Sequence, residues 1–124
     1  MLTSSIGLIL VFSGIVTVGG GVTAFLFPHL FLRLGFGTES VIAPATVFFV
    51  RHWGVLIFVI GALIVLSAFT IPIRAPVLIA AAIEKLAMGA LIFFGPMKRT
   101  PGMTAIAIVD GVFAVLYIVY LGVL

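Results

Sequence analysis

The sequence predicts an all-α integral membrane protein, an antiparallel four-helix bundle that forms a single domain over residues 1–124. Composition is the first observation behind this fold class. Hydrophobic residues make up 65% of the chain and charged residues 7%, and the mean hydropathy of +1.54 lies far from that of soluble domains. The second observation is that the apolar residues come in runs of about 20, the length that crosses a bilayer. They do not alternate with the period of two that a membrane β-barrel requires.

Prolines and glycines divide the chain into four predicted spanning helices, at about residues 5–27, 44–70, 76–95 and 102–124. The first is expected to stop at Pro28 and the third at Pro96, while Pro72 marks the turn between the second and third. The amino terminus lacks the features of a removable signal, so the first run is expected to remain as a helix. The connection at 28–43 mixes leucine and phenylalanine with Arg33, which predicts a segment lying along the membrane interface.

Small residues recur at intervals of seven, which predicts narrow seams where neighbouring helices approach closely. The first helix carries Gly7, Gly14 and Gly21, the second carries Gly54, Gly61 and Ala68, and the third continues weakly with Ala82 and Gly89. The three glycines at 19–21 also admit a hinge or a ligand contact, although close packing is the favoured interpretation.

The charges in the connections predict orientation. One side of the membrane receives Arg33, Lys98 and Arg99, and the other receives only Arg74 and the two termini. The positive-inside rule therefore predicts both termini outside, and the expected location is the cell inner membrane. The +3 net charge is spread over the connections, which gives no support for a nucleic-acid partner, and the absence of cysteine excludes thiol chemistry and thiolate-held metals.

Four charged residues fall inside the predicted spans: Arg51, Glu84, Lys85 and Asp110. Arg51 and Asp110 lie at matching depth, roughly 10 to 12 Å from the same surface, and the Glu84–Lys85 pair lies near the middle of the third helix. Each charge at the bilayer centre costs about 2.5–3.5 kcal/mol, and pairing in the bundle interior recovers much of that cost. The sequence thus predicts a buried polar network in which two cations balance two anions.

Other interpretations of these residues remain open. Arg51, His52 and Trp53 are also typical of an interfacial anchor, and Asp110 could lie shallow. Glu84 could serve as a proton or substrate site, although the adjacent Lys85 favours a locked ion-pair network. The sequence argues against a bis-histidine haem, because His29 and His52 stand at different depths, and no metal site is predicted.

Several of these features together resemble the DoxX-like group of small four-helix membrane proteins. They are the leucine and glycine connection after Pro28, the RHWG stretch at 51–54, the IEK stretch at 83–85 and the acid near the start of the fourth helix. The resemblance covers the whole chain and implies a fold and a membrane location. Members of that group include a subunit of a quinone-linked sulfur-oxidising enzyme and assembly chaperones for ion channels, so the resemblance leaves function open.

On these grounds the favoured function is a small accessory or scaffold subunit without catalytic activity of its own. Its expected partners are the lipid bilayer and either a second copy of the chain or another membrane protein. The alternative is a quinone- or lipid-binding subunit of a redox system. In that alternative Arg51 and His52 hold a polar headgroup while Phe49 and Trp53 flank its ring.

Overall fold

The computed structural model describes residues 2–37, 43–95 and 99–123, and in these ranges every regular element is a helix. The elements are α1 (Leu2–Leu26), α2 (Pro28–Phe36), α3 (Pro44–Phe69), a short 3₁₀ turn η1 (Ile71–Ile73), α4 (Arg74–Phe94) and α5 (Pro101–Val123). Four of these segments are long and apolar enough to cross a bilayer. The all-α membrane bundle predicted from the sequence is therefore confirmed.

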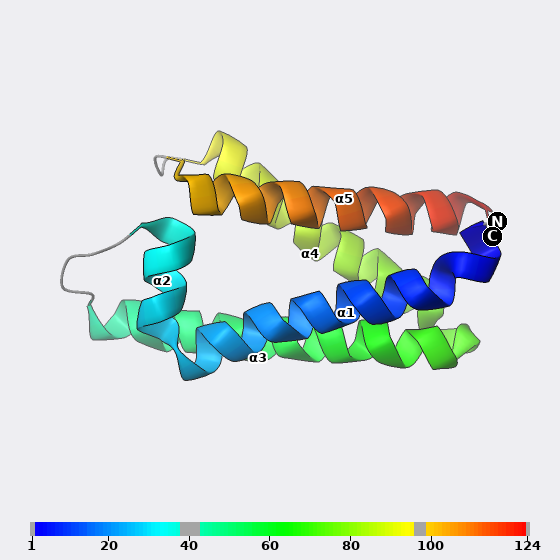
Figure 1. The fold of residues 1–124 in the computed structure, drawn as a ribbon, viewed down its shortest axis with the longest axis horizontal. Coiled ribbons are helices and arrows are strands. Elements are labelled where there is room, and N and C mark those ends of the chain that lie inside the picture. The colour runs from blue at the N-terminus through cyan, green and yellow to red at the C-terminus, as the bar shows by residue number, and fades with distance from the viewer. Residues whose placement is uncertain (1, 38–42, 96–98, 124) are drawn as a thin grey trace.

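The four long helices alternate in direction, and both termini lie at the same end of the bundle (Figure 1). The short helix α2 lies at the opposite end, between the α1–α3 pair and α5 (Figure 1). Arg33 and Arg99 belong to the α2 end and Arg74 to the terminal end, as the sequence predicts, and Lys98 lies outside the described residues. The side of the membrane that each end faces stays a prediction.

Prolines act mainly at the beginnings of helices. Pro28, Pro44 and Pro101 each occupy the first position of a helix, where a missing N–H is no loss. Phe27, which precedes Pro28, has φ −129° and ψ 61°, so α1 stops there and the chain turns into α2. The expected stop at Pro96 lies outside the described residues, and α4 itself ends at Phe94.

Two pairs of glycines bring α1 and α3 into backbone contact. A Cβ atom on Gly14 would lie 2.9 Å from the Gly61 carbonyl oxygen, and one on Gly21 would lie 2.6 Å from that of Gly54. Any side chain at these positions would force the helices apart. The predicted seam is thus confirmed for four of its glycines.

Other members of the predicted seams do not take part. An added Cβ would meet no atom within 4 Å at Gly7 or Gly89, and the same is true of Gly19 and Gly20. An added Cβ would enter open space at these four glycines, so a seven-residue interval alone does not decide which glycine is covered.

The apolar core fills the terminal half of the bundle. It comprises residues from the start of α1, the end of α3, the first half of α4 and the second half of α5: Ile6, Leu10, Ile64, Leu78, Ala81, Ala82, Phe113, Tyr117 and Tyr120. The α1–α3 pair and helix α5 are farther apart toward the α2 end, and α2 stands between them (Figure 1). In this other half a smaller apolar cluster of Ile92, Met103 and Ala107 lies between α4 and α5.

We predict that Gly14→Leu destabilises the bundle by about 1–3 kcal/mol or more, because the new side chain must displace α3. Gly19→Leu is the matched control, since its side chain would enter open space on the same helix. Thermal unfolding in mild detergent, followed by circular dichroism, should show a lower Tm for Gly14→Leu alone. Equal Tm values for the two variants would contradict the glycine contact.

Candidate functional site

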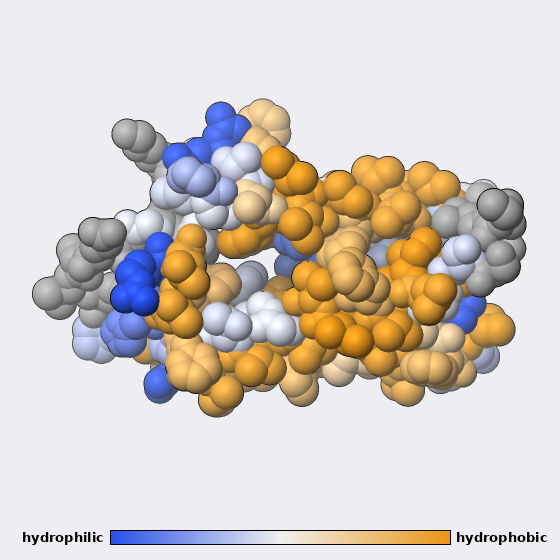
Figure 2. Space-filling view, in the orientation of Figure 1, coloured by the Kyte–Doolittle hydropathy of each residue, from blue (hydrophilic) through white to orange (hydrophobic). Residues whose placement is uncertain are grey.

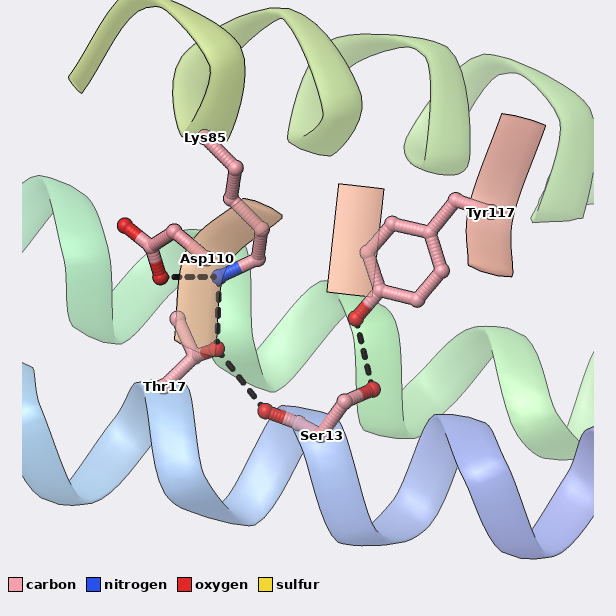
Figure 3. Close-up of polar contacts among 5 residues, drawn as sticks. All are labelled: Ser13, Thr17, Lys85, Asp110 and Tyr117. Carbon is pink, nitrogen blue, oxygen red and sulfur yellow. Dashed lines mark hydrogen bonds and ion pairs between the residues drawn. The ribbon is translucent and has the colours of Figure 1, made fainter. Parts of the chain in front are cut away.

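The ammonium of Lys85 is the centre of the polar interior. Lys85 lies midway along α4 and is 2% exposed. Its Nζ donates to the Thr17 hydroxyl at 3.1 Å and to Asp110 Oδ1 at 3.3 Å (Figure 3). It also lies 5.5 Å from the centre of the Phe113 ring. Helices α1, α4 and α5 are therefore joined through one charged group.

A row of hydroxyl groups continues from this point along α1 (Figure 3). Thr17 donates to the Ser13 carbonyl at 2.8 Å, and Tyr117, which is fully buried, donates to Ser13 Oγ at 2.6 Å. The link through Ser13 passes by way of a backbone carbonyl, which can only accept hydrogen bonds. The row therefore fixes these side chains in place and is not a continuous path for a proton.

Glu84 precedes Lys85 and adds a second carboxylate to the interior. Its Oε2 atom is buried and has no hydrogen-bond partner among the residues that the structure describes. Lys85 is paired with Asp110 instead, because adjacent positions on a helix point about 100° apart. A buried carboxylate oxygen without a partner is costly, so Glu84 is unlike the satisfied Lys85–Asp110 pair.

These charged residues line a pocket of about 260 Å³ to which all five α-helices contribute. On the face drawn in Figure 2, the surface is hollowed between α1, α2 and α5, and pale and blue residues show behind the orange ones. Phe31 and Trp53 form one wall, with ring centres 5.2 Å apart. The lining residues are Val16, Thr17, Gly20, Phe31, Trp53, Ile57, Glu84, Lys85, Ala105, Ile106, Val109 and Asp110.

Arg51 does not belong to this network, and here the sequence prediction is corrected. Its side chain is exposed and makes no hydrogen bond or ion pair with a described residue. Trp53 faces the pocket. Arg51 is two positions earlier on α3, about 200° around the helix axis from Trp53, and so faces away from the pocket. Among the described residues the pocket thus holds one cation and two carboxylates, so the predicted balance of charges is not present.

The four residues expected to bind a ligand are also divided between different places. Arg51 and His52 line a separate pocket near the start of α3, together with Phe25 and Phe48. Trp53 lines the polar pocket, and Phe49 is exposed with its ring against that of Phe48. Successive helix positions are turned by about 100°, so the run from Phe49 to Trp53 is spread around α3 and only Arg51 and His52 share a pocket.

His29 on α2 and His52 on α3 are both exposed. Within residues 2–37, 43–95 and 99–123, no three His, Cys, Asp or Glu side chains lie close enough to hold a metal ion.

Sequence reasoning missed several polar residues of the interior. Ser13 and Thr17 stand four apart on α1, and Tyr117 stands seven after Asp110, so each pair shares a helix face. That spacing could have predicted their positions. Arg74 was also missed, because it was considered only as a loop charge. Its guanidinium donates to the carbonyls of Ser67 and Ala68, both at 2.7 Å, and so binds the end of α3.

Comparison of the chain with models of known families, with curated proteins and with solved structures gives no match in any of the three. The resemblance to the DoxX-like group therefore stays a prediction, and the site has to be interpreted from its own geometry.

We predict that Lys85 and Asp110 are energetically coupled. Lys85→Met leaves the Asp110 carboxylate buried without its partner, and Asp110→Leu likewise leaves the Lys85 ammonium buried without its partner. The double variant removes both charges. Its loss of unfolding free energy should therefore be smaller, by about 1–3 kcal/mol, than the losses of the two single variants added together. Unfolding by denaturant in detergent measures all three variants.

A parallel cycle with Arg51→Leu and Asp110→Leu serves as the control for this coupling. Since Arg51 lies outside the pocket, its effect and that of Asp110 should add to within about 0.5 kcal/mol. Strong coupling in this cycle, or none between Lys85 and Asp110, would contradict the arrangement of the network.

Proposed function

We propose that this small multi-pass membrane protein is an accessory subunit that binds an amphipathic molecule dissolved in the bilayer, a lipid or a quinone. The observation that carries the proposal is the pocket with Glu84, Lys85 and Asp110 on its lining, inside segments that span the membrane. Apolar pockets with a few convergent polar groups are the usual form of small-molecule sites. Ionisable residues inside a span are expensive, and they typically mark functional sites.

The composition of the lining supports a ligand with a polar head and an apolar body. Val16, Ile57, Ile106 and Val109 offer apolar contacts, while the three charged residues offer polar ones. A purely structural ion pair would need only Lys85 and Asp110. Glu84 has no described partner for its buried oxygen, so a bound molecule would supply the contact that the chain does not.

A role in assembly, with a second copy of the chain or with another membrane protein, is the second candidate. The seam between α1 and α3 is already used within the chain and is not free for a partner. Gly111 on α5 has no neighbour within 4 Å of an added Cβ, so it leaves a place where a partner helix could come close. The resemblance to the DoxX-like group is compatible with both candidates.

We predict that the purified protein carries about one equivalent of a lipid or quinone, detected by mass spectrometry of an organic extract and, for a quinone, by absorption. Gly20→Phe should abolish this content, because Gly20 lines the pocket and an added side chain meets no atom at its Cβ. Gly19→Phe, which places the same ring outside the pocket, is the control. Equal content in both variants would exclude this pocket as the site.

We predict for the assembly role that Gly111→Leu reduces the size of the complex in mild detergent while the chain stays folded, since leucine there would displace only a partner. Size-exclusion chromatography with light scattering measures this. A single size for the wild type and Gly111→Leu would argue against assembly through this part of α5.

A further inference from the structure

We infer that the ligand of the polar pocket is a lipophilic amine, an amphiphile whose head is a protonated ammonium group held by Glu84. This inference rests on the proposed function, because it selects, among the amphipathic molecules that the same pocket could bind, a lipid with an amine head over a quinone or a phospholipid. It follows from three properties of the described residues: the charge of the lining, the aromatic wall and the depth of the charged groups.

The lining of the pocket carries more acidic than basic groups. Lys85 is the one cation on the lining, and Glu84 and Asp110 are the two carboxylates. The ammonium of Lys85 is already engaged by Thr17 and Asp110. With both acids ionised the lining carries one negative charge in excess, at a depth where an unbalanced charge is costly. A cationic ligand would cancel that charge, a neutral ligand would leave it, and an anionic ligand would increase it.

Hydrogen bonding leads to the same class of ligand. The buried Oε2 of Glu84 is an acceptor without a described partner. An ammonium head donates up to three hydrogen bonds, and a charge-assisted bond to a carboxylate is among the strongest available. A quinone, in contrast, brings carbonyl oxygens that only accept hydrogen bonds, so it would leave the Glu84 oxygen without a donor.

The aromatic wall adds a second attraction for a cation. Phe31 of α2 and Trp53 of α3 line the same pocket as Glu84. The faces of aromatic rings attract ammonium groups, most strongly where water is excluded. A carboxylate and two aromatic rings around one space are therefore a suitable set for an organic cation.

Depth distinguishes a simple amine from a phospholipid. Asp110 stands nine residues after Pro101, the first residue of α5, which places it roughly 13 Å along the helix. A phospholipid head would have to bring its phosphate to that depth, next to two carboxylates. A single-chain amine brings only the ammonium and an apolar tail, which the apolar part of the lining can accept.

The test uses the fact that Trp53 is the only tryptophan of the chain and lines the pocket, so its fluorescence reports occupancy directly. The full-length protein in phosphatidylcholine nanodiscs is titrated with decylamine, decanol and decanoate, three probes with the same chain and different heads. Decylamine should change the Trp53 emission in a saturable way, with decanol and decanoate about tenfold weaker or more.

Variants test the role assigned to Glu84. Glu84→Gln should weaken decylamine binding by about tenfold or more, and Glu84→Asp should restore part of it because the charge is kept. Arg51→Gln, outside the pocket, is the control that should bind as the wild type does. If Glu84→Gln does not fold, the comparison of the three probes on the wild type decides alone. Unchanged binding in a folded Glu84→Gln would overturn the inference.

The remaining outcomes separate this inference from the proposed function. If decanol or a short-chain quinone binds as tightly as decylamine, the pocket is a ligand site but the ammonium assignment is wrong. If no probe changes the Trp53 emission, and the purified protein also carries no lipid or quinone, both the ammonium assignment and the proposed function are wrong.

Discussion

The charge of Lys85 has to be neutralised inside the bilayer, and much of the structure depends on how this is done. An ammonium at that depth needs a carboxylate and further polar partners, because the surrounding lipid offers none. Asp110 of α5 and Thr17 of α1 supply them, and the Phe113 ring adds a third contact. Since the partners come from two other helices, the same contacts that stabilise the charge also hold α1, α4 and α5 in one arrangement.

Packing of the bundle is uneven along the membrane normal. At the terminal end, a continuous apolar core joins α1, α3, α4 and α5, and Arg74 fastens the end of α3. At the other end, the glycines of α1 and α3 keep those two helices together, whereas α2 stands between them and α5. The polar pocket lies in this second half, which also holds a smaller apolar cluster between α4 and α5.

The sequence predicts the fold well because its main constraints are local. Apolar length and prolines define the spans, the bilayer admits only helices and closed barrels, and the absence of a period of two leaves helices. The polar site is less predictable, because it depends on which helix faces which. Lys85 and Asp110 come together as opposite charges at similar depth, but Arg51 has the same depth and points elsewhere. Rotation of a helix by a few tens of degrees decides such contacts, and composition does not fix that rotation. Thr17 and Tyr117 were overlooked because a single hydroxyl in an apolar run is a weak signal.

The attachment of α2 has a consequence for how such a site could diversify. Thr100, which caps α5, also donates to the Gly35 carbonyl at 3.0 Å, and Gly102 lets the start of α5 come against the same part of α2. Phe31 lies on this short helix, whereas the charged residues belong to α4 and α5. One part of the aromatic wall and the carboxylates of the pocket thus belong to different helices. Substitutions at Phe31 can therefore alter the wall while Glu84 and Asp110 keep their places on α4 and α5.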